Sequence, residues 1–336
     1  MMRLTLACLT LLAAAPPAAL RPEMASLLST QLKFSQGDLN DLQSGKVVKH
    51  GLSTSAPGEI AVVGGVRVRA PLRRLIDGVR DITRFKSGPA VLEIGRFSDP
   101  PVASDLNGLT VTPEDFDAGD CRIGDCDVRL PAEAIERVPH DPAGTDGARR
   151  QAETERWFKQ VLLDHVSAYW SGSANRIRRY DDDSPSVEPG KEFDAVLKNA
   201  PEAGALVPGL PGHLIHFPAH QLENAEDFLY WSKEKFGLGP FITVTQVTIV
   251  CPGDALCVIA SKDVYSSRYL DASLSLTIAS VDPGDPSAFY LVYSNRSRAS
   301  ALKGLFGSVR KAIAERRARG GLDETLKTVK ARLEAR

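Results

Sequence analysis

The sequence lacks any strong bias of charge. Its 336 residues contain 41 Lys and Arg against 42 Asp and Glu, which gives a formal net charge of −1. Proteins that bind nucleic acid through their overall charge show a clear basic excess. The balance therefore gives no reason to expect a nucleic-acid partner. With 43% hydrophobic residues, the chain still has enough apolar side chains to form a folded core.

The sequence also lacks the recognised motifs of several enzyme classes. It contains no G-x-S-x-G nucleophile elbow, no phosphate-binding P-loop and no G-x-G-x-x-G dinucleotide fingerprint. Its many serines therefore have no recognised setting as nucleophiles. We expect no cofactor and name no catalytic residue from the sequence.

Long apolar runs are absent after the start of the chain, so no later segment predicts a membrane span. The start itself has Arg3, an apolar run over residues 4–15 and then small residues, which is typical of a secretory signal peptide. We predict that residues 1–20 are a signal peptide and that the mature protein is periplasmic or secreted from a bacterium. The alternative is a start codon placed too far upstream.

Cysteines are few, and four remain once Cys8 is assigned to the signal peptide. They form two close pairs, Cys121 with Cys126 and Cys251 with Cys257. An even number of cysteines in an exported chain predicts disulfides. Local pairing is favoured among the three possible connectivities, because a Pro-Gly-Asp turn would bring the second pair together. Zinc binding by four converging thiolates fits an exported protein less well, and no metal is expected.

Hydrophobic periodicity divides the rest of the chain into recognisable elements. We predict a helix over 23–43, strands over 46–52 and 59–70, an amphipathic helix over 71–86 and a strand over 90–97. A loop follows to 127, then a mostly helical region over 131–236 that ends in a short aromatic helix. Four strands over 241–250, 256–266, 269–281 and 288–295 and a helix over 302–333, broken at glycines 320 and 321, complete the chain.

The third of the four late strands has a clean two-residue alternation. One face carries Leu270, Ala272, Leu274, Leu276 and Ile278, and the other carries Tyr269, Asp271, Ser273, Ser275 and Thr277. Alternate side chains of a strand point to opposite faces of a sheet. The pattern predicts a strand with one buried apolar face and one polar face.

The order of these elements resembles the START-like (helix-grip, SRPBCC) superfamily. The resemblance is carried by "VRVRAPLRRLIDGVRDITRFKSGPAVLEIG" at residues 66–95 and by "YLVYSNRSRASALKGLFGSVRKAIAERRARGGLDETLKTVKARLE" at residues 290–334. It implies an α+β fold in which a curved antiparallel sheet packs on a long C-terminal helix. Residues 21–97 and 237–336 would form the two parts of this domain, and residues 98–236 a loop and helical insertion.

The resemblance also implies a function and a binding site. START-like domains hold an apolar small molecule or a lipid in a cavity between the sheet and the C-terminal helix, with the 71–86 helix near its mouth. The ligand-binding residues would be Leu270, Ala272, Leu274 and Leu276 on the strand, facing Leu302, Phe306 and Val309 on the helix. The alternative is that these side chains fill a solid core.

Three histidines, His213, His216 and His220, lie close together in the sequence. They support a second hypothesis, an enzyme related to START-like hydrolases or cyclases, in which this loop would be the site. Pro211 and Gly212 before them and Pro218 among them argue against regular helical geometry and so against a metal site, and a structural loop is the alternative.

Charged residues within the late strands leave two interpretations open. Lys262, Asp263, Arg268 and Asp271 either orient a ligand on the concave face or form cross-strand ion pairs on the outer face. The alternation around residue 271 favours the outer face.

Two surfaces suggest partners. The stretch from Lys303 to Arg319 has six cations and one acid, Glu315, which would suit peripheral contact with anionic lipid headgroups or simply face solvent. A third hypothesis for the whole chain is a non-catalytic envelope protein, whose partner surface would use Tyr230, Trp231 and Phe236.

Overall fold

A computed structural model describes residues 20–54, 56–139, 147–173, 178–235, 239–304 and 307–335. The predicted signal peptide, except Leu20, lies outside the described residues, as do Phe236 and Phe306. Within the described ranges no helix is both long and apolar enough to cross a bilayer.

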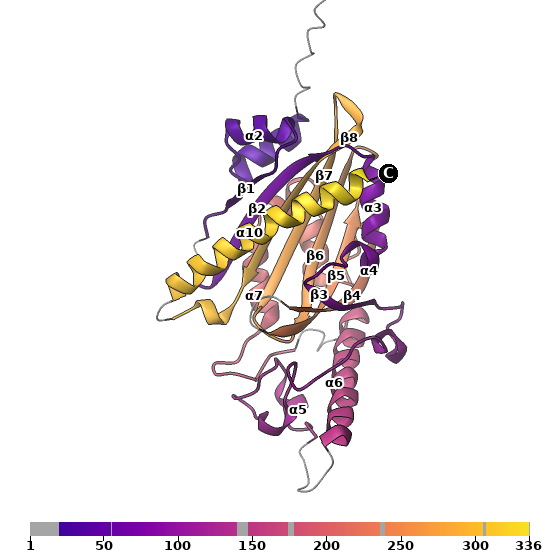
Figure 1. Cartoon of the computed structure of the whole chain (residues 1–336), viewed down its shortest axis with the longest axis vertical. Helices are drawn as coiled ribbons and strands as arrows, with labels where there is room; N and C mark the ends of the chain where they lie inside the picture. Colours follow the sequence, from indigo (N-terminus) through magenta and orange to yellow (C-terminus); the bar gives the residue numbers. More distant parts are fainter. Residues whose placement is uncertain are drawn as a thin grey trace, which may run out of the picture.

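The centre of the fold is an antiparallel sheet of eight strands in the order β1-β2-β8-β7-β6-β5-β4-β3 (Figure 1). The strands are β1 (Val48–Gly51), β2 (Glu59–Val68), β3 (Val91–Arg96), β4 (Ala225–Lys235), β5 (Pro240–Val250), β6 (Leu256–Ser266), β7 (Ala272–Asp282) and β8 (Asp285–Arg298). Strands β4 to β8 form a meander, and β2 joins it by pairing with β8. The four predicted late strands are confirmed.

Helices and short turns of helix surround the sheet. Before β3 they are α1 (Pro22–Ser26), the π-helical turn η1 (Leu27–Gln31), α2 (Gln36–Gln43), α3 (Leu72–Arg80) and α4 (Ile82–Phe85). Between β3 and β4 are η2 (Ala103–Leu106), η3 (Ala118–Asp120), α5 (Ala132–Ile135), α6 (Gly147–Trp170), α7 (Pro189–Lys198), α8 (Glu202–Ala205) and α9 (Leu210–His216). After β8 come η4 (Ser300–Leu302) and α10 (Gly307–Glu334).

Two predictions of helices were wrong in part, and one was wrong altogether. The helix expected over 23–43 is interrupted after η1, where Lys33 has a φ of 60° and Ser35 forms a capping box with Asp38 that starts α2. The aromatic helix expected over 225–236 is strand β4, because apolar side chains occur on both of its faces and hide the two-residue period. The expected break at glycines 320 and 321 is absent, and α10 is continuous.

The two faces of the sheet are covered by different parts of the chain. Alternate residues of one strand belong to different core clusters: in β2, Ala61 and Val63 belong to one cluster and Val62 and Val66 to another. The first cluster contains side chains of α1, η1, α2 and α7 to α9, and we call this side of the sheet the insertion face. The other contains side chains of α3, α4 and α10, and we call it the α10 face.

The insertion between β3 and β4 extends the insertion face. Its own cluster combines α6 residues Phe158, Leu162 and Val166 with Trp231 of β4 and Val244 of β5. The helical insertion therefore shares a core with the sheet.

Helix α10 lies diagonally over one side of the sheet, as Figure 1 shows, and packs chiefly against β2 and β1. Leu322 and Leu326 are buried and would meet a Cβ at Gly64 within 3.1 Å, so β2 must carry a residue without a side chain there. Helix α3 buries Leu72, Leu75, Ile76 and Val79 at helical spacing on the same face of the sheet.

Both predicted cysteine pairs are disulfides. Cys121 is bonded to Cys126, and Cys251 to Cys257 across the turn between β5 and β6. Disulfides persist in oxidising, extracytoplasmic compartments. Their presence agrees with the predicted export.

Candidate functional site

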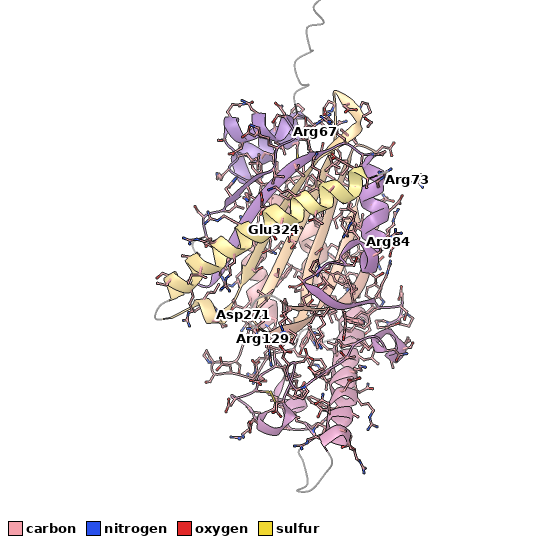
Figure 2. The ribbon with its side chains drawn as sticks, viewed as in Figure 1. Arg67, Arg73, Arg84, Arg129, Asp271 and Glu324 are labelled. Carbon is pink, nitrogen blue, oxygen red and sulfur yellow. A yellow bond between two sulfur atoms is a disulfide. The ribbon has the colours of Figure 1, made fainter. Side chains whose placement is uncertain are left out.

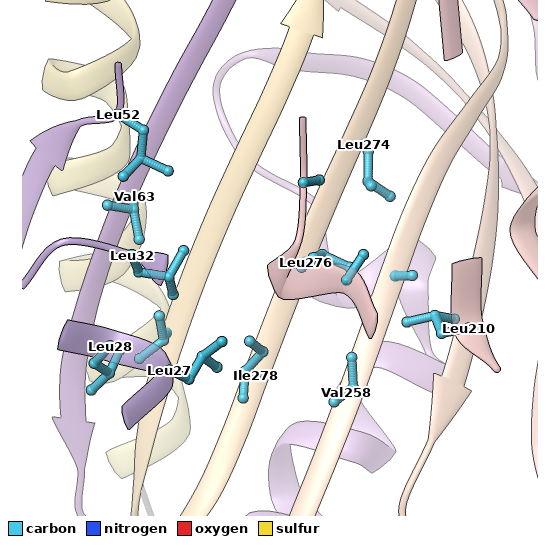
Figure 3. Close-up of a cluster of buried hydrophobic side chains, with 14 of the residues drawn as sticks. Leu27, Leu28, Leu32, Leu52, Val63, Leu210, Val258, Leu274, Leu276 and Ile278 are labelled. Carbon is cyan, nitrogen blue, oxygen red and sulfur yellow. The ribbon is translucent and has the colours of Figure 1, made fainter. Parts of the chain in front are cut away.

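The apolar strand surface that was predicted to face the C-terminal helix lies on the other side of the sheet from it. Ala272, Leu274 and Leu276 are buried on the insertion face, among side chains of the N-terminal turns and of α7 to α9 (Figure 3). Because α10 packs on the other face, the predicted cavity between these residues and α10 was wrong. The prediction that β7 has one apolar and one polar face is confirmed, but the apolar face lies against the insertion.

The polar half of the same alternation faces α10. Seven polar side chains of β6, β7 and β8 on the α10 face are half-buried, and we call them the hydroxyl patch: Ser261, Asp263, Ser275, Thr277, Tyr293, Asn295 and Ser297. These are three interior strands of the sheet. Side chains in such positions are buried when a second layer covers them. Their partial exposure shows that α10, α3 and α4 do not cover this part of the face completely.

Hydrogen bonds join the patch across strands. The Ser275 hydroxyl and the Tyr293 hydroxyl are 2.8 Å apart, and Asn295 Nδ2 donates to Ser275 Oγ at 3.0 Å. Ser297 Oγ donates to the side-chain oxygen of Asn295 at 2.8 Å. Such networks fix the orientation of each group. The patch is thus an ordered array of donors and acceptors, half open to solvent.

A charged group borders the patch at β4. Lys86, just after α4, donates to Glu234 Oε1 at 2.6 Å and to the Tyr230 hydroxyl at 3.1 Å. Burial disfavours the charge of Lys86, but the interactions with Tyr230 and Glu234 outweigh it and raise the pKa of the lysine. Lys86 therefore stays cationic and ties the segment after α4 to the sheet.

Asp263 is the acidic group of the patch. It lies on β6 and accepts a hydrogen bond from Thr245 Oγ1 at 3.0 Å. Burial raises the pKa of this carboxyl to about 6, although Lys86 and Thr245 act in the opposite direction. A carboxyl whose charge is disfavoured by its surroundings costs stability at neutral pH, which is common where a group is kept for binding or catalysis.

This carboxyl predicts a pH-dependent stability difference. Its pKa rises from an ordinary 3.8 to about 6 on folding, so the folded state holds its proton over a pH range where the unfolded state releases it. Stability from this group is fully present below pH 3.8 and is lost as pH rises through 6. We expect Asp263→Asn to raise the free energy of unfolding at pH 8 by up to about 3 kcal/mol and to change little at pH 3.5.

Urea unfolding of both proteins at the two pH values measures this difference. Asp285 is a control of opposite sign, because its hydrogen bond with Ser287 lowers the pKa of its carboxyl. The stability that the Asp285 carboxylate contributes is present above its pKa in the unfolded state and is lost as pH falls. Asp285→Asn should therefore be less stable than wild type at pH 8. An Asp263→Asn protein that is less stable than wild type at pH 8 would refute the assignment.

Three other predicted ligand-binding residues, Leu270, Leu302 and Val309, lie apart from the patch, and Phe306 lies outside the described residues. Leu270 is half-buried just before β7, and Leu302 is half-buried in η4. Val309 is 58% exposed on α10.

The histidine loop does not bring its three imidazoles together. His213 is buried, and its Nε2 lies 3.0 Å from Asp227 Oδ1 while its Nδ1 lies 2.8 Å from the His220 carbonyl oxygen. Burial opposes the charge of His213, but the bond with Asp227 outweighs it and raises its pKa. His216 and His220 are exposed. Among the residues that the structure describes, no group of three potential ligands is placed to hold a metal ion.

The charged residues of the late strands divide between the two faces. Lys262 is buried on the insertion face and donates to the Leu214 carbonyl at 2.7 Å. Asp271 is buried and pairs with Arg129 of the insertion at 2.7 Å, at the end of the sheet shown in Figure 2. Arg268 donates to the Asp127 carbonyl of the insertion at 3.0 Å. Asp263 alone of the four lies on the hydroxyl patch.

Cavities also lie away from the patch, in the part of the chain that the structure describes. One of about 10 Å³, large enough for a single water, lies in the insertion core beside His165 and Tyr265. A surface pocket of about 210 Å³ is lined by Arg67, Arg69, Lys330 and Glu334 near the end of α10. In that pocket Arg67 is paired with Asp282 at 2.6 Å, and Lys330 with Glu334 at 2.7 Å, so these two cations already have acidic partners.

Most of the hydroxyl patch was not identified from the sequence, but a signal for it exists. Tyr293, Asn295 and Ser297 alternate in β8 just as Ser273, Ser275 and Thr277 alternate in β7. Two neighbouring strands that carry polar residues at paired positions predict a polar sheet face.

The sequence matches no family model, and it is not significantly similar to any curated protein.

Proposed function

We propose that this is an exported START-like protein of the helix-grip type that binds a lipid or another small amphipathic molecule. The proposal rests on one observation: three interior strands of the sheet leave a hydrogen-bonded polar patch half open between α10 and the α3–α4 segment. The order of strands, with β2 beside β8 and a long helix after β8, supports the helix-grip assignment.

The chemistry of the patch changes the expected ligand. The sequence led us to expect an apolar cavity, but the open part of the α10 face carries hydroxyl, amide and carboxyl groups. These groups would pair with the polar part of a ligand, since buried donors and acceptors need partners. The apolar part would replace water over the rest of the face, at about 25 cal/mol per Å² before the costs of binding.

Solvent extraction tests this function. We expect protein purified from its own host to release a bound small molecule that mass spectrometry detects. A double variant, Tyr293→Phe with Asn295→Leu, should lose it because three of the hydrogen bonds that order the patch are removed.

Asn107→Leu is the matched control, because Asn107 is exposed on the insertion. It should retain the molecule, and melting curves should show all three proteins folded. The proposal fails if wild-type protein releases nothing, or if the double variant releases as much as wild type.

A further inference from the structure

The N-terminal half of α10 exposes an apolar stripe with no partner in the described chain. Val309 and Ile313 are 58% and 51% exposed. They are four positions apart and so lie on one side of the helix. Figure 1 shows this end of α10 projecting past the strands at the side of the sheet.

The stripe points away from the protein. Ile313 and the buried Leu322 are nine positions apart, about two and a half turns, so their side chains leave α10 on opposite sides. Lys311 lies three turns before Leu322 and therefore on the same side of the helix as Leu322. The Lys311 Nζ donates to the Thr54 hydroxyl at 2.5 Å. The inward side of this half is therefore occupied by Lys311 and its neighbours, and the apolar stripe faces solvent.

Cations surround the stripe. Arg310, Arg316, Arg317 and Arg319 are exposed, whereas the single acid of this half, Glu315, is half-buried 3.9 Å from Lys311. An apolar stripe flanked by arginines is the pattern of a helix that lies in the interface of an anionic membrane. A second copy of the chain fits less well, because its arginines would meet those of the first.

We propose that residues 307–320 dock on an anionic phospholipid surface. Val309 and Ile313 enter the headgroup region, and Arg316, Arg317 and Arg319 contact lipid phosphates. This inference rests on the outer side of α10 and is independent of what the hydroxyl patch binds.

Co-sedimentation of the full mature chain with vesicles tests the proposal. We expect binding to phosphatidylcholine vesicles that contain phosphatidylglycerol, weaker binding at high salt, and little binding to phosphatidylcholine alone. Arg316→Glu with Arg317→Glu should weaken binding about tenfold or more, since each cation near an anionic surface contributes about fivefold. Val309→Ser with Ile313→Ser should weaken it by a similar factor.

Ile123→Ser is the control, because Ile123 is 53% exposed in the disulfide loop of the insertion. It should bind as wild type does. The proposal is overturned if wild type does not bind the anionic vesicles or if the α10 variants bind as well as wild type. Self-association through the stripe would also contradict the proposal. It would appear as a dimer on gel filtration, and the double variant Val309→Ser with Ile313→Ser would be a monomer.

Discussion

Arg296→Leu is expected to lower the free energy of unfolding by about 3 to 5 kcal/mol, because it leaves the buried Glu202 carboxylate without its cation. Glu59 would keep only its longer pair with Arg298, at 3.7 Å. Arg296 of β8 lies on the insertion face, 3.4 Å from Glu59 of β2 and 3.0 Å from Glu202 of α8. All three side chains are at least nine-tenths buried. The cluster joins two strands to the insertion, and urea unfolding at pH 7 measures its loss.

Two further variants test whether the loss of stability comes from the buried charges. Arg296→Leu combined with Glu59→Gln and Glu202→Gln should recover part of the loss, because the uncompensated charges are removed. Arg73→Leu, which breaks an exposed pair with Asp77, should change stability by less than about 1 kcal/mol. If Arg296→Leu also costs less than this, water must reach the two carboxylates and the cluster is not buried as described.

Trp231→Ala should lower the free energy of unfolding by about 3 to 5 kcal/mol, as for other large-to-small changes of a buried aromatic residue. Trp231 is 1% exposed in β4, and its indole nitrogen donates to the Asp105 carbonyl at 2.8 Å. Its ring also covers Gly95 of β3, where an added Cβ would lie 2.6 Å from the ring. Thermal or urea unfolding measures the effect.

The stability of Trp231→Ala distinguishes two roles for Trp231, a buried core residue or part of a surface that binds a partner. If Trp231 belonged to the interaction surface considered from the sequence, its loss would leave stability nearly unchanged. A double-mutant cycle sharpens the test: Gly95→Ala should be destabilising in wild type and much less so beside Trp231→Ala, because the clash is gone. Additive effects would mean that the ring does not cover β3.

Sequence periodicity predicted much of the fold because local patterns determine it. The late strands, the α3–α4 segment and both cysteine pairs follow from alternation, helical spacing and turn residues. Strand β4 was misread because both of its faces are buried, Phe228 and Tyr230 against α3 and α4, Leu229 and Trp231 against the insertion. A strand that is apolar on both faces has no two-residue period to detect.

The site could be predicted less well, since it depends on which layer covers which face. The alternation in β7 separates Leu274 and Leu276 from Ser275 and Thr277, but it does not tell which set faces α10. That assignment depends on the insertion, which covers the apolar face with its own helices and leaves the polar face to α10. The number and placement of the covering helices depend on tertiary packing, and no local pattern in the strands predicts them.

The central claim is that a small molecule binds at the hydroxyl patch of strands β6 to β8, which is half open between α10 and the α3–α4 segment. A crystal structure of protein purified from its own host, without any delipidating step, tests it most directly. The account predicts connected density over the patch, with a polar group in hydrogen-bond distance of Tyr293 or Asn295. A patch that holds only water, or a ligand bound on the insertion face beside Leu274, would contradict it.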